Sequence, residues 1–455
     1  MLDRRRFLAS ASTLTVGAAL AGAAPAAALP DPLAAHHLTS GTPPRRADLT
    51  VDDIARAEVV QGLRFTPADR ALMLDDVIDR LGSLEAIRDA EPPNDVPPAL
   101  VLDLELSGRA RPAPGAGPSL DPLPGLPRPA SDHDLAFASI RELGAMLRSG
   151  SVTSVMLTGF FLDRLRQFDP TLQAVVTLTA ERALATAAER DRELASGVDR
   201  GPLHGIPYGA KDLLAARGYP TTWGAEPYRD QVLDEDALVV RRLEEAGAVL
   251  VAKLTLGALA WGDVWFGGTT MNPWNPDQGA SGSSAGPGAA VAAGLVPFAI
   301  GSETLGSIVS PSTRNGVTGL RPTTNRVPTD GAMALSWSMD KLGPMTRSAL
   351  DAALVFDAIR GPASGAPDSA FPFAPADSLT GTRVGIVLPE GEGDGPDADR
   401  ATLDVVRQLG ADVREVTWPS DLPVGPLRLI LEAEAAAAFD GFTRSRRADE
   451  LVRQE

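Results

Sequence analysis

The sequence predicts an α/β fold in which a β-sheet is buried between layers of helices. Amphipathic helical patterns alternate with short apolar runs along residues 131–455, which is typical of a sheet that is covered on both faces. A segment of that length can bury the core of one domain. The chain has no cysteine, so this core forms without disulfide bonds.

The individual core elements follow from the period of their apolar residues. Helices are expected at residues 134–148, 153–168, 180–194, 235–246 and 398–409. Strands are expected at residues 174–178, 205–210, 249–252, 383–388 and 412–417. Residues 427–455 return to a helical pattern. Helices therefore separate most of the strands, as in other α/β domains.

Two further helices are expected before the core, in an N-terminal extension at residues 29–110. Thr50 and Asp53 fit a capping box for a helix that ends near residue 61. Thr66 and Pro67 supply a cap and a first-turn proline for the second helix. We expect both helices to pack on the core or on a neighbouring subunit rather than to act chemically.

A linker is expected between the extension and the core. Residues 111–130 are rich in proline and glycine, a composition that makes a semi-rigid connection. The core domain then occupies residues 131–455.

The N-terminus predicts export. Arg4, Arg5 and Arg6 precede Phe7 and Leu8 in a twin-arginine pattern, and a weakly apolar run and an A-x-A cleavage site follow. Residues 1–28 are therefore expected to be a cleaved signal that sends the protein to the periplasm or the medium, without stable membrane insertion afterwards. The net charge of −17 argues against nucleic acid or an anionic membrane as a partner.

Lys211 is the first candidate catalytic residue. The chain has 42 lysines and arginines together, of which only Lys211, Lys253 and Lys341 are lysines. A buried lysine can lose its proton and act as a base, whereas arginine stays charged. The apolar residues before Lys211 predict a short buried strand that carries its amine into the core. The alternative is a structural lysine beside Asp212.

A segment rich in glycine and serine, residues 279–310, supplies the candidate hydroxyl groups. Its two glycine–serine turns flank apolar runs that need burial, so the turns are expected to be fixed in the core. Glycine also lets backbone amides approach a ligand closely, and such amides can stabilise an oxyanion. The alternative is a buried structural turn.

Several motifs in this order resemble the amidase signature family. They are residues 201–212, 236–253, 272–275, 282–284, 306–308 and 319–323. The resemblance runs from about residue 134 to the end of the chain. It implies the amidase signature fold, a central mixed β-sheet with helices on both faces, and amide hydrolysis by a Ser-Ser-Lys triad. Members of the family usually continue beyond the point at which this chain ends, so the domain is expected to be incomplete.

By this resemblance, Lys211 matches the basic lysine and Ser283 the bridging serine, whose peptide bond is usually cis. Ser307 matches the nucleophile. The backbone amides of Thr304, Leu305 and Gly306, together with that of Ser307, match the oxyanion hole. The expected reaction converts a carboxylic amide into an acid and ammonia or an amine through an acyl-enzyme.

The chain departs from the family pattern at Ala285 and Pro287, after the bridging serine, and at three positions around the expected nucleophile. Leu305 stands where a glycine is common, so the oxyanion hole depends on an allowed backbone angle at this residue. Glu303 stands where aspartate is common. Val309 replaces an arginine that usually pairs with the acidic residue, so Glu303 needs another partner.

Other chemistries fit less well. Ser284 lies in a G-x-S-x-G pattern, but that fold needs a later histidine, and all four histidines come earlier. Ser338 and Lys341 fit S-x-x-K, but the required later K-T-G motif does not occur. The scarcity of histidine and the lack of cysteine argue against a metal site, and no cofactor motif is present.

The expected partner is therefore a small-molecule amide, with a possible homodimer. Two alternatives stay open. One is a glutamine-hydrolysing amidotransferase A-type subunit, and the other is a non-catalytic binding protein that retains the fold. Trp261, Trp265, Phe266 and Trp274 could line an apolar acyl pocket, although core packing is the alternative for each.

Overall fold

A computed structural model of the chain describes residues 49–90, 118–361, 371, 373, 375, 378–387, 397–417 and 423–452. The predicted signal at residues 1–28 lies outside them, as does the first part of the predicted linker. The chain divides into two compact units, Met1–Ile78 and Asp79–Glu455. The predicted limits of signal, extension, linker and core stay predictions. No described helix is both long enough and apolar enough to cross a bilayer.

The first unit contains helix α2 (Val51–Gln61), close to its predicted limits. The backbone N–H of Thr50 donates to the Asp53 carboxylate at 3.0 Å, as a capping box requires. Gly62 ends the helix in the left-handed region, with φ of 64°. Local capping chemistry therefore sets both ends of α2.

The second predicted helix is α3 (Pro67–Asp89). Thr66 donates its backbone N–H to Asp69 at 2.8 Å and accepts the Asp69 N–H at 3.2 Å. Arg70, in the first turn of α3, forms a 2.7 Å ion pair with Glu58 of α2. This pair joins the two helices within the unit.

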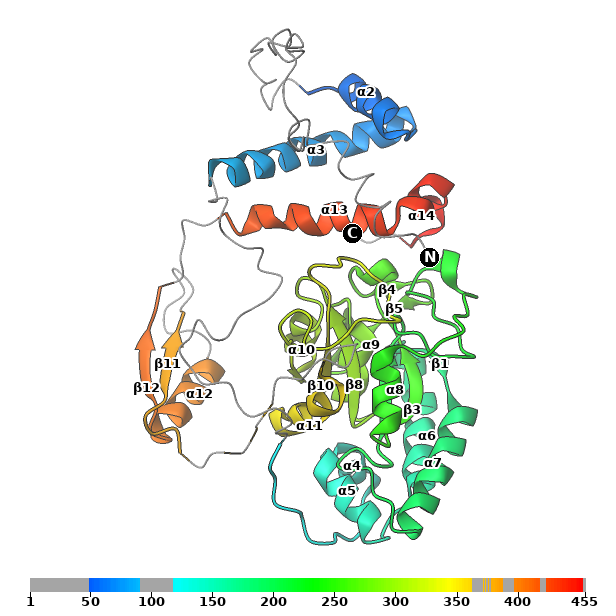
Figure 1. Cartoon of the computed structure of the whole chain (residues 1–455), viewed down its shortest axis with the longest axis vertical. Coiled ribbons are helices and arrows are strands. Elements are labelled where there is room, and N and C mark those ends of the chain that lie inside the picture. The colour runs from blue at the N-terminus through cyan, green and yellow to red at the C-terminus, as the bar shows by residue number, and fades with distance from the viewer. Residues whose placement is uncertain are drawn as a thin grey trace, which may run out of the picture. The chain divides into compact units, whose positions relative to one another are not determined.

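The core of the second unit is a six-stranded mixed sheet with the order β1-β3-β2-β8-β10-β9 (Figure 1). Its strands are β1 (Val175–Leu178), β2 (Pro207–Lys211), β3 (Val249–Leu254), β8 (Phe298–Glu303), β9 (Thr318–Gly319) and β10 (Lys341–Thr346). β2 is parallel to both β3 and β8, and the other pairs are antiparallel. The predicted α/β class with a mixed sheet is confirmed.

Both faces of this sheet are buried. In β8, Phe298 and Ile300 belong to one apolar cluster, whereas Ala299 belongs to another. Successive side chains of a strand point to opposite faces, so the two clusters occupy the two sides of the sheet. Leu250 and Val251 of β3 alternate in the same way.

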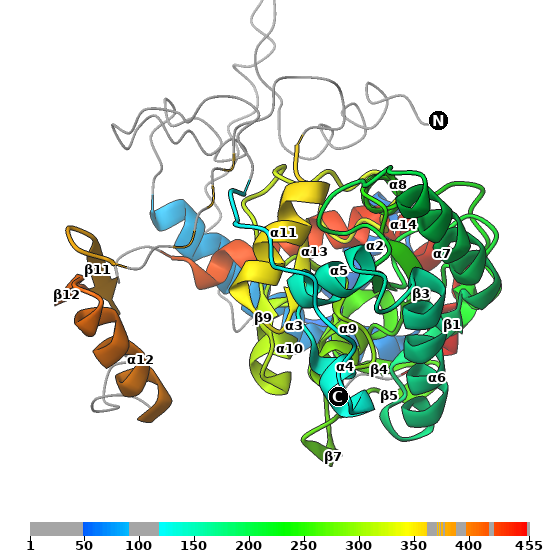
Figure 2. The same ribbon diagram turned by 90° about the horizontal axis from the view of Figure 1, so that it is seen from below.

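Helices cover the sheet and connect its strands. They are α4 (Asp132–Phe137), α5 (Ile140–Arg148), α6 (Ser154–Leu172), α7 (Ala180–Ala195), α8 (Leu238–Glu245), α9 (Ala285–Ala292), α10 (Val309–Asn315) and α11 (Ala349–Ile359). α6 and α7 lie side by side in both views (Figure 2). α9 consists of small and apolar residues and is buried throughout, because it packs closely against the sheet.

One predicted helix is two helices in the structure. The pattern at residues 134–148 is divided between α4 and α5, so the prediction of one continuous helix is wrong. The break lies at Ala138, whose ψ of 141° is not helical. Ser139 then caps α5 through a reciprocal pair with Glu142, in which each residue accepts the other's backbone N–H. Local capping outweighs the continuous apolar pattern here.

A separate two-stranded sheet follows the core. β11 (Arg383–Ile386) is parallel to β12 (Asp412–Glu415), and α12 (Asp397–Gln408) connects them. The three elements agree with the predicted strand, helix and strand. Their sheet is distinct from the six-stranded sheet.

The C-terminal residues form helices α13 (Arg428–Ala438) and α14 (Asp440–Ser445), as the sequence pattern predicts. The described end of the predicted linker, from residue 118, contains no helix or strand up to residue 130. Leu126 in this stretch accepts hydrogen bonds from the hydroxyl groups of Ser149 and Ser151, at 2.9 and 2.6 Å. These bonds fix the stretch to the end of α5.

Candidate active site

Two neighbouring parallel strands carry the candidate residues to one edge of the sheet. β2 ends at Lys211, and β8 ends at Glu303. Ala210 is paired with Ile300, so both strands end at the same edge of the sheet and β8 extends two residues further than β2. The carboxyl ends of parallel strands are a common position for active sites. The turn after β8 contains residues 304–307.

Lys211 is fully buried and lies among hydroxyl groups. Its Nζ atom is 2.8 Å from Ser283 Oγ, 3.0 Å from Ser284 Oγ and 2.8 Å from Ser302 Oγ. Within the described residues, no carboxylate forms an ion pair with it; Asp212 instead pairs with Lys253. The structure thus brings together the predicted base and the predicted bridging serine.

This environment favours the uncharged form of the Lys211 amine. Burial holds its pKa well below the usual range, and the more distant charges of Asp340 and Glu303 oppose this effect only in part. A neutral amine has a lone pair, so it can accept a proton from an adjacent hydroxyl group.

Ser283 lies in a tightly packed turn that enters helix α9. The Gly282–Ser283 peptide bond is cis, as the family resemblance implies. A Cβ atom at Gly282 would lie 1.8 Å from the backbone oxygen of Gly262, so only glycine fits at this position. The Ser284 hydroxyl, next in the chain, donates to the Ser302 carbonyl at 3.0 Å. The turn is therefore fixed to β8.

Ser307 lies in the turn between β8 and α10 and is partly exposed. Its carbonyl accepts the Ser284 N–H at 3.2 Å, which places the turns of Ser283 and Ser307 in contact. The described contacts include no hydrogen bond between the Ser307 hydroxyl and Ser283 or Lys211. Such catalytic hydrogen bonds often form only when substrate is bound. The roles of Lys211, Ser283 and Ser307 stay predictions.

The predicted oxyanion turn has permitted backbone angles. Gly306 is in the left-handed region, with φ of 88°, where glycine is favoured. Leu305 does not have a positive φ, so its side chain adds no strain at this position. The part of the chain that is described offers no acceptor for the backbone N–H groups of Leu305 and Ser307. The Gly306 N–H contributes to lowering the pKa of Glu303. The roles of Thr304, Leu305 and Gly306 in an oxyanion hole stay predictions.

Glu303 has a charged partner, although Val309 replaces the arginine that was expected to pair with it. Arg321, which follows β9, forms a 2.9 Å ion pair with it. The backbone N–H groups of Ile308 and Val309 donate to its other oxygen at 2.8 and 3.0 Å. Burial raises the pKa of Glu303, but these hydrogen bonds outweigh it and the net shift is downward. A charged Glu303 therefore closes the turn that holds Ser307.

Asp212 and Lys253 form a second buried polar group directly beside the site. Their charged atoms lie 2.6 Å apart and both side chains are fully buried. Lys253 also donates to Pro220 O and Thr221 Oγ1, both at 3.1 Å, and Asp212 accepts the Thr222 N–H at 2.9 Å. The pair fixes residues 220–222 against β2 and β3. This is a structural role, since both charges are satisfied internally.

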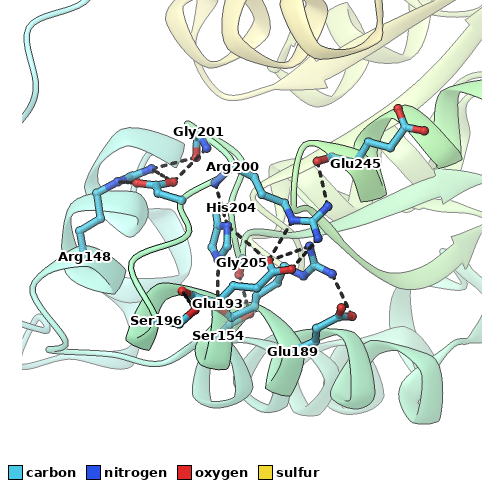
Figure 3. A network of polar contacts seen from close by, with 12 residues as sticks. Arg148, Ser154, Glu189, Glu193, Ser196, Arg200, Gly201, His204, Gly205 and Glu245 are labelled. Atoms are coloured by element: carbon cyan, nitrogen blue, oxygen red, sulfur yellow. Dashed lines mark hydrogen bonds and ion pairs between the residues drawn. The ribbon is translucent and has the colours of Figure 1, made fainter.

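A network around His204 fixes the loop that leads into β2 (Figure 3). His204 accepts the backbone N–H of Arg200 at 3.1 Å, and its other ring nitrogen lies 2.9 Å from the Arg190 carbonyl. Glu193 pairs with both Arg190 and Arg200, at 3.0 and 2.5 Å. His204 is thus a hydrogen-bonding residue, and it helps to set the position of the strand that carries Lys211.

A cavity of about 170 Å³ adjoins the candidate residues. Ser302, a partner of Lys211, and Thr304 of the oxyanion turn both line it, with Asp340 and the aromatic ring of Trp337. The other lining residues are apolar except Thr329: Leu213, Ala260, Ala332, Met333, Ala334, Leu335 and Leu342. A ligand in this cavity would lie beside the predicted oxyanion hole.

The four aromatic residues that could line an acyl pocket lie elsewhere. Trp265 packs against Phe266, with ring centroids 4.8 Å apart, and Trp261 lies under the guanidinium group of Arg428. Trp274 is 73% exposed and donates from its ring nitrogen to Asn315 O at 2.8 Å. None of the four lines the described cavity, and their place in an acyl pocket stays a prediction.

Four contributors are not evident from the sequence: Ser302, Arg321, Trp337 and Asp340. Ser302 could have been found from the pairing of β2 with β8, because it lies one residue before the end of β8. In the sequence, Asp340 is part of only one candidate motif, the S-x-x-K pattern of residues 338–341. Arg321 belongs to the motif at residues 319–323, but that motif does not reveal its pairing with Glu303. Trp337 reaches the site through the return of the chain after β9, which no local pattern reveals.

Comparisons with known proteins agree with this architecture. A family model described as Amidase matches residues 156–450. The A-type subunit of the glutamyl-tRNA(Gln) amidotransferase of Halorhodospira halophila (strain DSM 244 / SL1) is 39% identical over 324 residues, which cover 67% of this chain and 66% of the relative. Its counterpart of the same name from Roseiflexus sp. (strain RS-1) is 38% identical, covering 68% of this chain and 66% of its own length. The chain thus spans slightly less than two thirds of these relatives.

A solved structure shows the same fold. The peptide amidase from Stenotrophomonas maltophilia is 35% identical, with a TM-score of 0.58 over 67% of this chain and 68% of that chain. The family model covers more than half of the chain, and the mixed sheet and the Lys211–Ser283 geometry lie within the matched region. The chain belongs to the amidase signature family.

Proposed function

We propose that this chain is an amide hydrolase that cleaves a carboxamide C–N bond with Ser307 as nucleophile, Ser283 as proton bridge and Lys211 as base. The buried amine of Lys211 carries this proposal. It lies 2.8 Å from the Ser283 hydroxyl group and has a pKa that burial lowers. A structural lysine would be expected to have a carboxylate partner, as Lys253 has in Asp212.

The proposed reaction begins when Ser307 Oγ attacks the amide carbonyl carbon. Its proton passes to Ser283, whose own proton passes to Lys211. Backbone N–H groups of the turn 304–307 stabilise the oxyanion. The relay then returns a proton to the leaving nitrogen, so that ammonia or an amine departs and an acyl-enzyme remains. Water then gives a proton to the same relay and attacks the acyl carbonyl carbon. The bond to Ser307 Oγ breaks, the relay returns a proton to Ser307, and the acid is released.

The curated relatives favour a glutamine-hydrolysing subunit over the stand-alone exported amidase. Both curated matches are named as A-type components of a glutamyl-tRNA(Gln) amidotransferase. Such a role would require partner subunits that bind tRNA. One observation favours the exported amidase instead, namely the twin-arginine pattern at Arg4 and Arg5.

Covalent labelling tests whether the chain is an enzyme. A fluorophosphonate is expected to label the wild type at Ser307 and to leave Ser307→Ala unlabelled. Equal labelling of both proteins would place the nucleophile elsewhere. A complete lack of labelling in the wild type, together with no amide hydrolysis, would favour the non-catalytic binding protein.

Ammonia release tests the substrate class. Glutamine is compared with a panel of aliphatic, aryl and peptide amides, each with Ser307→Ala as the control. Turnover of glutamine above all members of the panel would support the amidotransferase-type subunit. Turnover of another amide without glutamine hydrolysis would support the stand-alone amidase.

A further inference from the structure

The loop of residues 335–340 forms part of the cavity wall and is attached to the predicted oxyanion turn. Leu335, Trp337 and Asp340 of this loop line the cavity. One Asp340 oxygen accepts the N–H groups of Leu335 and Ser336 at 2.8 and 3.0 Å, which closes the loop on itself. The other oxygen accepts the Thr304 hydroxyl at 2.5 Å. Asp340 therefore connects the loop to Thr304.

The same loop is held from outside by Glu434 of helix α13. A single oxygen of Glu434 accepts the Ser338 N–H at 3.0 Å, the Ser338 hydroxyl at 2.9 Å and the hydroxyl of Ser336. Burial raises the pKa of this carboxyl group, but the bonds from Ser336 and Ser338 outweigh burial and lower it. Glu434 is therefore a charged acceptor at neutral pH, and charge-assisted hydrogen bonds are the stronger kind.

Helix α13 is itself fixed to the part of the core that carries the site. Leu431 is buried, and Phe439 at the end of the helix packs against Trp223, with ring centroids 6.4 Å apart. The backbone N–H of Trp223 donates to the carbonyl of Asp212, the residue after Lys211, at 3.3 Å. The guanidinium group of Arg428 lies 5.6 Å from the Trp261 ring. The helix can therefore act as a fixed support for the loop.

We propose that Glu434 is a positioning residue for the reaction. It holds the loop 335–340, which lines the cavity, in the arrangement that binds substrate. In the described structure it makes no contact with Lys211, Ser283 or Ser307, so it acts only through the loop. The inference rests on the proposed amide hydrolase function, because it assigns Glu434 to the substrate cavity of that enzyme.

Hydrogen exchange measures how firmly Glu434 holds the loop 335–340, and it does not require an active enzyme. Glu434→Ala removes all three hydrogen bonds, and the Ser338 amide is expected to exchange about tenfold faster, the factor that corresponds to the loss of one hydrogen bond to a charged group. Glu434→Gln keeps an acceptor oxygen and is expected to show a smaller increase. Glu432→Gln is the matched control, because Glu432 lies on the same helix and pairs with Arg80 and Arg428, at 2.7 and 3.2 Å, rather than with the loop. Equal exchange in Glu434→Ala and wild type overturns the proposal.

Steady-state kinetics then measure the consequence for binding. The substrate is the amide with the highest turnover among glutamine and the panel. In Glu434→Ala the KM is expected to rise about tenfold while kcat changes little, because the loop loosens and the catalytic groups stay in place. Glu434→Gln should recover part of the loss, and Glu432→Gln should match the wild type. An unchanged KM, or an equal fall in kcat and in kcat/KM, contradicts a positioning role at the cavity.

These results separate the inference from the proposed function. If the wild type neither reacts with a fluorophosphonate nor hydrolyses any amide, the hydrolase proposal fails, and the exchange rate of Ser338 still decides whether Glu434 holds the loop. If the wild type is active and Glu434→Ala is indistinguishable from it in both measurements, only the inference fails.

Discussion

The buried amine of Lys211 lowers the stability of the folded protein and at the same time supplies a base for the proposed reaction. Its amine is fully buried among three hydroxyl groups, and burial lowers its pKa. The unfolded chain binds a proton at this amine up to its ordinary pKa of about 10.4. Between the lowered pKa and that value the unfolded state holds more protons, so the stability cost of Lys211 falls as the pH rises. The same lowered pKa leaves a neutral base at working pH.

Replacement of this base should strongly lower turnover. Lys211→Arg keeps a cation that cannot lose its proton, so kcat/KM is expected to fall on the order of 10²–10⁴-fold at every pH. In the wild type, kcat/KM should fall on acidification through the lowered pKa, because the protonated amine cannot accept the Ser283 proton. The measurement is a pH–rate profile of both proteins. A Lys211→Arg variant that retains near-normal activity would exclude Lys211 as the base.

At the scale of elements, close backbone contact sets the turn that carries Ser283. A Cβ atom at Gly282 would overlap the carbonyl of Gly262, which is backbone and cannot rotate away. Gly282→Ala is therefore expected to lower the free energy of unfolding by about 1–3 kcal/mol. It should also lower kcat/KM, because Ser283 is the next residue. Urea unfolding and amide hydrolysis measure the two effects.

Gly159 provides the matched control for this substitution. It lies inside α6, and a Cβ atom there would meet nothing within 4 Å. Gly159→Ala is expected to raise the free energy of unfolding by about 0.5–1 kcal/mol, because alanine loses less backbone entropy in a helix. If both variants were stabilised, the proposed overlap at Gly282 would be wrong.

The Asp212–Lys253 pair joins the end of β2 to β3 and should be essential to stability. Asp212→Asn leaves the Lys253 charge buried without its carboxylate, at a cost of about 3–5 kcal/mol. Asp212→Leu combined with Lys253→Met removes both charges and should recover much of that loss. Chemical denaturation of the single and double variants measures the coupling. Asp440→Asn, which breaks a pair on the exposed surface of α14, should leave the unfolding midpoint unchanged.

The elements with strong local patterns are those that the sequence predicts well. Helix α2 and strand β2 follow from a cap and from a buried apolar run, and the turn at Gly282 follows from its glycine and serine residues. The helix break at Ala138 is not predicted because an amphipathic pattern continues across it, and only the pairing of Ser139 with Glu142 shows where a new helix begins.

Features that depend on contacts between residues far apart in the sequence could not be predicted from local patterns. Arg321 replaces the expected arginine at Val309 from a separate segment of the chain. Trp337 lines the cavity in place of the four aromatic residues that lie between the lysine and serine motifs. In both cases the side chain reaches the site through a loop, and loop conformation has no periodic sequence signature.

At the scale of the whole molecule, the charge of −17 bears on the choice of partner. A surface that is strongly negative repels the phosphate backbone of RNA, so tRNA binding would have to be supplied by other subunits. A small amide without charge meets no such repulsion. Net charge therefore agrees with a small-molecule substrate under both functional candidates and places no constraint on which amide is cleaved.

The location of the protein decides between those candidates, and the N-terminal arginines allow a direct test. The twin-arginine pattern predicts that the folded protein is exported, whereas an amidotransferase subunit must meet tRNA in the cytoplasm. Substitution of Arg4, Arg5 and Arg6 with lysine keeps the positive charge and removes the motif. Export of the full chain, measured by fractionation of the native host or a related bacterium, is expected in the wild type and lost in the triple variant. Retention of the wild type in the cytoplasm would contradict the export prediction and favour the glutamine-hydrolysing subunit.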